Sequence, residues 1–203
     1  MTAIMGRPKG VTDEQIIVAA RHCFLKRGAG VAATIIARDL GVSHTTLFNR
    51  FQSKEALMIA ALGPPDEVPW VKALEAGPDD RPIREQLIEH VTVISTYFQE
   101  LQLGLSMLQA AGISPAKAWR ARKGKTSPEK AYRALVAWLH RAQKQDRLAR
   151  CNVEALASTI LGALHGRAFS ARVRGETTTP AANERYVEHF VQLLWDGIAG
   201  GKT

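Results

Sequence analysis

The sequence of 203 residues predicts an all-α fold, with four short helices followed by about five longer ones. Helix-start signals recur along the chain, and apolar residues at helical spacing follow them. Three of these signals, Ser114-Pro115, Ser127-Pro128 and Thr179-Pro180, place a capping hydroxyl before a proline at the first helical position. No segment shows the sustained alternation expected of a strand. Hydrophobic residues make up 46% of the chain, which is enough for a substantial core.

The short helices are delimited by local signals at both ends. Thr12 and Gln15 form a capping box, in which each side chain can bind the other residue's amide. Gly28 and Gly30 stop the first helix and Gly41 ends the second, and Gly63-Pro64-Pro65 closes the fourth because a doubled proline cannot continue a helix. The four helices are expected at residues 12–28, 33–40, 43–49 and 53–62.

The longer helices follow the proline break. One of them, over residues 82–111, carries so much apolar surface that we expect it to be buried on more than one side. The others are expected at residues 115–122, 128–148, 152–173 and 180–199.

Charge and cysteine content restrict the class of protein. The formal net charge of +8 favours an anionic partner such as nucleic acid. Residues 115–150 are the most basic part, with 11 Lys and Arg against 2 Asp and Glu. Cys23 and Cys151 lie far apart and are expected to be reduced core thiols in a reducing compartment. The sequence shows neither a signal peptide nor a membrane span, so we expect a cytoplasmic protein without a membrane partner.

The segment GVSHTTLFNRF, residues 41–51, has the spacing of a helix-turn-helix. Ala37 is a small residue where two helices would cross, Gly41 can take a positive φ in the turn, and Leu47 is a buried apolar residue on the second helix. Helical hairpins without a DNA role can show the same spacing. The polar residues of the segment therefore decide the interpretation.

These polar residues are suited to reading and holding DNA. His44, Thr45 and Asn49 can bind base edges in the major groove, where hydrogen-bonding groups and thymine methyl groups distinguish the base pairs. The hydroxyl of Thr46 and the cations of Arg50 and Lys54 are suited to binding phosphate. Lys54 also follows the Ser53 cap, at a helix N-terminus that favours anions.

The sequence ATIIARDLGVSHTTLFNRFQSKEALMIAAL, residues 33–62, resembles the DNA-binding region of TetR-family transcriptional repressors. The family pattern is I-A-x-x-x-G-V-S, then T-L-Y, then F-x-S-K-E-x-L, and the match extends over about residues 12–62. The resemblance implies a homodimer that binds a palindromic operator in double-stranded DNA through the recognition helix at residues 43–49. It also implies base contacts from His44, Thr45, Phe48 and Asn49, and phosphate contacts from Thr46, Arg50 and Lys54.

The resemblance also implies the domain organisation. A basic N-terminal arm, residues 1–11, would precede a helix-turn-helix DNA-binding domain with its linker helix at residues 12–62. A regulatory and dimerisation domain would follow at residues 66–203. The sequence departs from the family pattern at Phe48, which replaces a phosphate-binding tyrosine, and at Ala32 and Ala33, which remove a helix cap.

The arm contains GRPKG, residues 6–10, which is basic and unsuited to a helix. Arg7 could enter a narrow A·T-rich minor groove. A solvated tail is the alternative. The basic segment at residues 117–125 leaves three alternatives: a solvated face, a site for an anionic effector, or a second contact with the DNA backbone.

In the body, the resemblance implies a four-helix dimer interface and a pocket for a small-molecule effector of unknown identity. On periodicity alone the stripes of the dimer-interface candidates could equally be intramolecular core, and the ligand-binding candidates have a plain core role as their alternative. The dimer-interface candidates are Leu156, Ile160, Ala163, Leu164, Tyr186, Phe190, Leu194 and Ile198. The ligand-binding candidates are Trp70, Phe98, Leu101, Leu105, Met107, Trp119 and Trp138, because large apolar and aromatic side chains form most pocket walls.

The sequence thus predicts a ligand-responsive, sequence-specific DNA-binding transcriptional regulator, most simply a repressor released from its operator by a small molecule. One alternative is an all-α ligand-binding protein or enzyme with an incidental helix-turn-helix, and another is a non-specific nucleic-acid packaging protein. No cofactor, metal site or catalytic residue is predicted, because no phosphate loop, carboxylate pair, nucleophile with its base or cluster of metal ligands stands out. His90, His140 and His165 are isolated on their helices.

Overall fold

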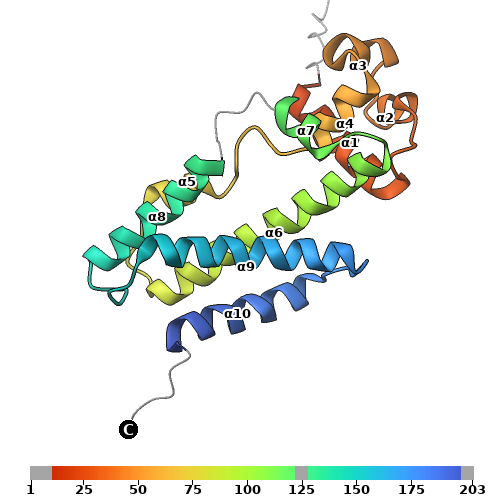
Figure 1. The fold of residues 1–203 in the computed structure, drawn as a ribbon. Helices are drawn as coiled ribbons and strands as arrows, with labels where there is room; N and C mark the ends of the chain where they lie inside the picture. The colour runs from red at the N-terminus through yellow and green to blue at the C-terminus, as the bar shows by residue number, and fades with distance from the viewer. Residues whose placement is uncertain (1–10, 122–127, 198–203) are drawn as a thin grey trace, which may run out of the picture. The chain divides into compact units, whose positions relative to one another are not determined.

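The computed structural model describes residues 11–121 and 128–197, and these residues form ten helices (Figure 1). The first five helices along the chain are α1 Asp13–Arg27, α2 Ala33–Asp39, α3 His44–Phe51, α4 Lys54–Leu62 and α5 Val71–Ala76. The others are α6 Ile83–Ala110, α7 Pro115–Ala121, α8 Pro128–Lys144, α9 Val153–Val173 and α10 Pro180–Asp196. The predicted all-α class is confirmed.

Local capping chemistry sets most of the helix starts as the sequence predicts. The Thr12 hydroxyl accepts a hydrogen bond from the Gln15 amide at 3.2 Å, and the Thr12 amide donates to the Gln15 side chain at 2.9 Å. Ser43, Ser53, Asn152 and Thr179 each accept from the amide three residues later, which satisfies a donor that the helix itself leaves free. Ala32 begins α2 without a side-chain cap, as its sequence implies.

The chain divides into two compact units, Met1–Pro64 with Gly104–Arg122, and Pro65–Leu103 with Lys123–Thr203. The first unit therefore contains the end of α6 and α7, which the sequence assigned to the body. Leu108 of α6 is fully buried in the same core as Phe24 of α1 and Leu62 of α4. Periodicity predicts the apolar stripe of α6, but it does not predict which other helices pack against each turn of that stripe.

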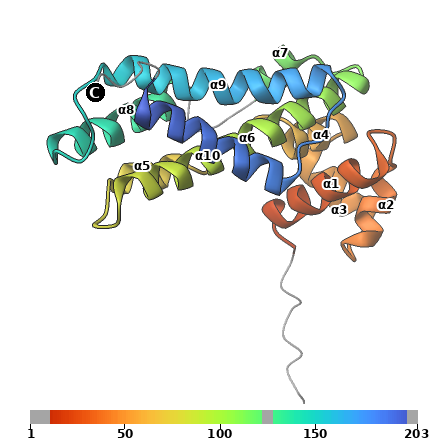
Figure 2. The same ribbon diagram turned by 90° about the horizontal axis from the view of Figure 1, so that it is seen from below.

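The second unit packs α5, α8 and α9 with the greater part of α6, and α10 lies next to α6 and α9 (Figure 2). Its core includes Leu87, Trp138 and Val187, all at most 3% exposed. A buried polar contact joins three helices: the Asn183 side-chain oxygen in α10 accepts from Ser95 in α6 at 2.7 Å and from Arg167 in α9 at 2.8 Å. This contact fixes the register of α10, because a buried polar group that lost its partner would carry the full cost of desolvation.

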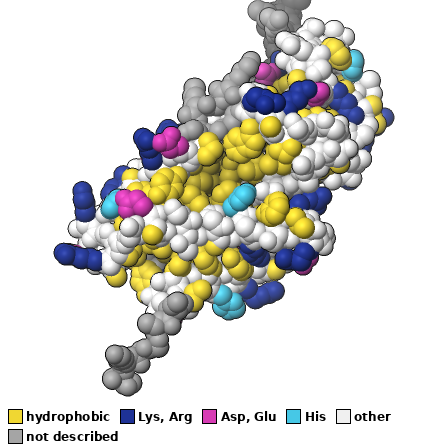
Figure 3. Space-filling model, in the orientation of Figure 1, with side chains coloured by type: hydrophobic (Ala, Val, Ile, Leu, Met, Phe, Trp, Pro, Cys, Tyr) yellow, Lys and Arg dark blue, Asp and Glu magenta, His cyan; other side chains and the backbone are white. Residues whose placement is uncertain are grey.

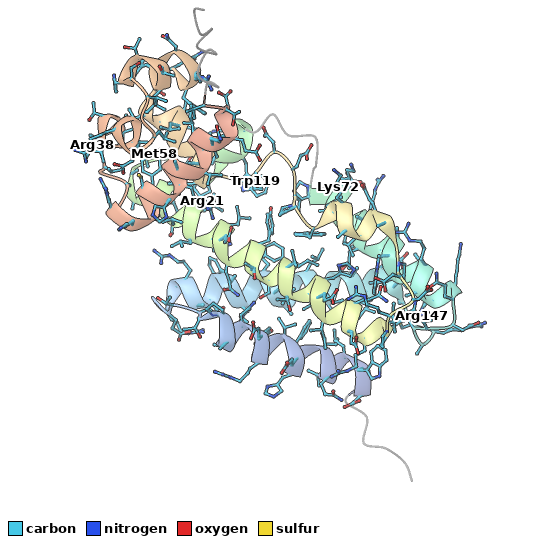
Figure 4. All side chains as sticks on the ribbon, turned by 180° about the vertical axis from the view of Figure 1, so that it is seen from behind. Arg21, Arg38, Met58, Lys72, Trp119 and Arg147 are labelled. Carbon is cyan, nitrogen blue, oxygen red and sulfur yellow. The ribbon has the colours of Figure 1, made fainter. Side chains whose placement is uncertain are left out.

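A side-chain clamp holds the start of α6. The Arg147 guanidinium donates to the carbonyl oxygens of Asp79 and Arg81, and Arg147 follows α8 at one end of the second unit (Figure 4). Gln86, only 2% exposed, accepts from the Asp79 amide at 3.0 Å. The loop between α5 and α6 is therefore tied to both α6 and the end of α8.

The expectation for the two cysteines is only half correct. Cys23 is buried and its thiol donates to Asp39 at 3.4 Å, but Cys151 is exposed, so only one of the two cysteines is a core residue. Cys151 precedes the Asn152 cap of α9, and its place outside the helix removes it from the apolar face.

Among the described residues, no helix is long and apolar enough to cross a membrane.

Candidate DNA-binding site

The recognition helix α3 is built from a cap, a turn and one apolar anchor. Gly41 takes φ +67° in the turn after α2, a conformation that favours glycine because it has no Cβ. Val42 donates its amide to the Ala37 carbonyl at 3.0 Å, and Ser43 then caps α3. Leu47, 2% exposed, is the buried anchor of α3, and α3 packs against α2 and α4. The predicted helix-turn-helix is thus present.

Burying Leu47 leaves the polar side of α3 outside. His44, Thr45 and Asn49 are exposed, as the sequence predicts for residues that reach base edges. Phe48 is 49% exposed and its ring lies 5.3 Å from the His44 ring, one helical turn away. His44 and Phe48 thus form an exposed pair of rings on α3.

The predicted phosphate contacts have different surroundings. The Thr46 hydroxyl lies 2.8 Å from the Ser43 hydroxyl and is half-buried. Arg50 is occupied within the chain, since its guanidinium donates to the Val11 carbonyl at 2.5 Å and to the Asp13 carboxylate at 2.9 Å. Arg50 therefore joins α3 to the start of α1. Arg7 lies outside the described residues.

Lys54 lies in the first turn of α4, beside a shallow hollow of about 410 Å³ that is lined by residues such as Gly30, Met58 and Ile113. The neighbouring Glu55 pairs with Lys117 of α7 at 2.5 Å. Lys117 is therefore held against α4 rather than being part of a freely solvated basic face.

The rest of α4 is fixed by contacts within the first unit. Arg21 of α1 donates to the Ala61 carbonyl at 3.1 Å, and Met58 points inward (Figure 4).

The seven ligand-binding candidates are divided between the two units. Leu105, Met107 and Trp119 belong to the first unit, and Trp119 is 37% exposed on α7 (Figure 4). Trp70, Phe98, Leu101 and Trp138 belong to the second unit, where Trp70 and Trp138 are core residues at 3% and 1% exposure. A hollow of about 230 Å³ in that unit is lined by other side chains, including Gln99, Arg172 and Thr178.

The dimer-interface candidates require a correction. Ile160 and Leu164 are at most 1% exposed, because they face the core of their own chain, so they cannot also contact a second copy. Leu156, Ala163, Tyr186, Phe190 and Leu194 are half-buried, and all except Ala163 pack against the same core. Ile198 lies outside the described residues. Ile160 and Leu164 thus belong to the core of the second unit, and the dimer interface itself stays a prediction.

Other apolar residues of α9 and α10, which sequence periodicity did not single out, are exposed in the single chain. Phe169 is 53% exposed, Val173 69%, Leu193 52% and Trp195 43%. Hydrophobic side chains are visible at the surface over these two helices (Figure 3). On α9, Gly162 and Gly166 have no neighbouring atom within 4 Å of an added Cβ, so this part of the helix surface is open. In the sequence, the only sign of these exposed residues was that each helix has two apolar residues outside its main apolar stripe.

Within the residues that the structure describes, no three His, Cys, Asp or Glu side chains are grouped as metal ligands would be. His140 instead pairs with Glu154 at 3.3 Å, and His165 contacts Gln102 at 3.0 Å. His90 lies edge-on to the Trp138 ring at 4.9 Å.

Comparisons with known proteins agree with this architecture. Residues 16–61 match the bacterial regulatory proteins of the tetR family. No curated protein matches the chain. The fold is similar to that of a putative TetR-family regulator from Mesorhizobium loti MAFF303099, with 18% identity, a TM-score of 0.63, and coverage of 89% of this chain and 93% of that one.

Two further solved structures share the fold. The fatty acid degradation regulator FadR from Bacillus halodurans is 19% identical, with a TM-score of 0.59 and coverage of 93% of this chain and 97% of that one. The TetR-family regulator PfmR from Thermus thermophilus is 20% identical, with a TM-score of 0.56 and coverage of 92% and 100%. The chain thus carries a tetR-family sequence match over residues 16–61 and shares the all-helical fold of these solved regulators.

Proposed function

We propose that this protein is a homodimeric repressor that binds a palindromic operator and leaves it when a small molecule binds the second unit. The observation that carries the proposal is that the polar side chains of His44, Thr45 and Asn49 on α3 are exposed while Leu47 is buried. A helix that only supported the fold would not need three base-reading side chains on one exposed face. Packaging of nucleic acid would need cations there instead.

Each residue of the site has a proposed role. His44, Thr45 and Asn49 read base edges, and Phe48 makes ring contacts with bases or sugars. Thr46 and Lys54 bind backbone phosphates, with the N-terminus of α4 adding its own attraction for anions. Arg50 is better placed to position the N-terminal arm, because it already binds Val11 and Asp13. Arg7 in that arm would then reach the minor groove.

The dimer would form through the outer face of α9 and α10. Phe169, Val173 and Leu193 are exposed in the single chain, and burying them against a second copy would remove apolar surface from water at about 25 cal/mol per Å². Gly162 and Gly166 would allow the α9 helices of the two copies to approach closely. Such a dimer can present two α3 helices about 34–36 Å apart, the spacing of one DNA turn.

Release from DNA requires that the effector prefer the non-binding conformation, since equal affinity for both conformations shifts nothing. A 100-fold loss of operator affinity corresponds to a differential of about 2.7 kcal/mol. Within the first unit, α4 and α6 meet backbone to backbone at Leu62 and Gly104. A displacement of α6 would therefore be transmitted to α4 without side chains between them to absorb it.

Selection of binding sites from random DNA duplexes tests the function. A regulator of this kind should enrich one palindromic sequence with a half-site spacing of about one DNA turn. Uniform, salt-sensitive binding of all duplexes would instead indicate packaging, and the absence of binding would favour a protein with an incidental helix-turn-helix.

A further inference from the structure

Three buried side-chain nitrogens in the described part of the chain have no hydrogen-bond partner, and all three belong to the second unit. They are the indole nitrogens of Trp70 and Trp138 and the Nε of Arg141. All three are donors. A buried donor without an acceptor costs about 1–3 kcal/mol, so such groups are rare in well-packed cores unless a ligand or partner satisfies them.

The three donors lie in one layer, between α5, α6 and α8. Trp70 directly precedes α5 and contacts the Tyr97 ring of α6 at 6.2 Å. Trp138 of α8 contacts the His90 ring of α6 at 4.9 Å. His90 and Tyr97 are two turns apart on the same side of α6, so the two indoles are separated by roughly 10 Å along that helix.

Arg141 adds a positive charge to this layer. It lies one turn after Trp138 on α8, and residues three apart share a helix face. Its guanidinium donates to the Leu74 carbonyl of α5 at 2.5 Å, and its Nε lies against Gly77, where a Cβ would approach to 3.2 Å. The Leu74 carbonyl therefore orients the Arg141 side chain toward α5. A carbonyl oxygen carries no net charge, so the positive charge of Arg141 is not neutralised.

No acidic side chain described in this layer pairs with Arg141. Glu75 of α5 pairs with Lys130, Glu89 of α6 with Arg81, and Glu129 of α8 with Arg133. Burial lowers the pKa of the neighbouring His90, so this imidazole is neutral near pH 7 and adds no second cation. The layer offers hydrogen-bond donors and one unpaired positive charge, surrounded by aromatic rings and by aliphatic core residues.

We propose that the effector is an organic carboxylate with an elongated apolar body, and that it binds between α5, α6 and α8. The carboxylate accepts from Arg141 Nε and the Trp138 indole, which are one helical turn apart, and the apolar body extends along α6 toward Trp70. An anion is preferred to a cation because every unsatisfied group is a donor. This inference rests on the proposed ligand response and names the ligand class for it.

Binding requires α5 to move, together with Trp70 and the Leu74 carbonyl that Arg141 binds. α5 has six residues, and Trp70 begins it without a side-chain cap. Only Val71 and Leu74 of α5 are buried in the core. A ligand that replaces their contacts and satisfies the donors of Arg141 and Trp138 can therefore favour a displaced α5.

Titration of the purified protein with octanoate, whose extended chain is of about the required length, tests the proposal. Octylamine and methyl octanoate are the controls for charge and for the apolar chain. Octanoate should change the tryptophan fluorescence and raise the Tm, while octylamine should do neither and the ester should bind more weakly. Equal binding of octylamine and octanoate would overturn the proposal, and so would no binding of octanoate at millimolar concentration.

Matched variants locate the site. Arg141→Gln and Trp138→Phe should each weaken octanoate binding about tenfold or more, the loss expected for one charge-assisted or buried hydrogen bond. Trp195→Phe, at an exposed indole on α10, should leave the affinity unchanged. Trp138→Phe keeps the proposal testable if Arg141→Gln does not fold. Unchanged affinity in Trp138→Phe would place the site elsewhere and overturn the assignment.

The fluorescence titration uses no DNA, so its outcome is separate from that of the proposed function. If the protein selects a palindrome but does not bind octanoate, the proposed DNA-binding function stands and the proposed ligand class is wrong. If the protein binds octanoate but selects no duplex, the proposed ligand site stands and the proposed repressor function is wrong.

Discussion

The backbone of Gly104 in α6 lies directly against the carbonyl group of Leu62, the last residue of α4. A Cβ at position 104 would overlap the Leu62 oxygen and lie 3.0 Å from its carbonyl carbon and 3.3 Å from its Cα. These neighbours are backbone atoms that cannot rotate away. Only glycine allows the helices to meet here, and the recognition helix α3 packs in turn on α4.

Gly104→Ala should therefore destabilise the protein by about 1–3 kcal/mol, the range for an overpacked site, and should also lower operator affinity by displacing α4. Urea unfolding and DNA titration measure the two effects. Gly30→Ala is the matched control, since an added Cβ at Gly30 meets no atom within 4 Å. Equal stability of the two variants would contradict a rigid contact between α4 and α6.

Asn49→Ala and Lys54→Ala should affect DNA binding in different ways. Asn49 is exposed on the reading face of α3, so its loss should cost about 1–3 kcal/mol at particular base pairs and relax the preference there. Lys54 would bind phosphate, so its loss should weaken all duplexes alike and reduce the salt slope by about one. Affinities for the selected operator and for single-base variants, measured at several salt concentrations, distinguish the roles. The same pattern in both variants would refute this division.

Phe169→Asp and Ile160→Ala should separate dimerisation from folding. Phe169 is 53% exposed in the single chain, so Phe169→Asp should weaken the dimer in sedimentation experiments and leave the monomer folded. Ile160 is fully buried, so Ile160→Ala should cost about 2–5 kcal/mol of unfolding free energy. Val18→Asp, at an exposed position on α1, is the control for adding a charge. A Phe169→Asp protein that stays dimeric would exclude this face.

Stability should fall as the pH falls below about 6.5, the ordinary pKa of histidine. Burial lowers the pKa of His90 in the folded protein, with Arg81 adding a smaller effect in the same direction, while Glu89 and Asp79 oppose it. The unfolded chain therefore binds a proton at a higher pH than the folded one, and stability is lost between the two pKa values.

His90→Phe keeps the ring beside Trp138 and removes this titration. Urea unfolding at about pH 7.5 and 5.5 should show a smaller loss of stability in the variant than in the unchanged protein. The pKa values of Asp79 and Glu89 are lowered by hydrogen bonds from Arg81, so their contributions are lost only at lower pH, below about 4. An identical loss in both proteins would assign the effect to other groups.

Helix starts and the recognition helix were predictable because their causes are local. A capping hydroxyl such as Ser43 acts on an amide three residues away, and the Gly41 turn needs only its own backbone freedom. The exposed face of α3 followed from the single buried position at Leu47. The same local signals gave the outer limits of α9 and α10 to within a few residues.

The sequence by itself determined the all-α class, the helix-turn-helix and the set of polar residues on α3, because capping, turns and periodicity depend on neighbours along the chain. Only the tertiary structure decided that Ile160 and Leu164 face their own core, that the end of α6 packs with the first unit, and that Arg141 Nε and two indoles lack partners. An apolar stripe predicts that a helix face will be buried. Which other helix covers that face depends on contacts between residues far apart in the chain.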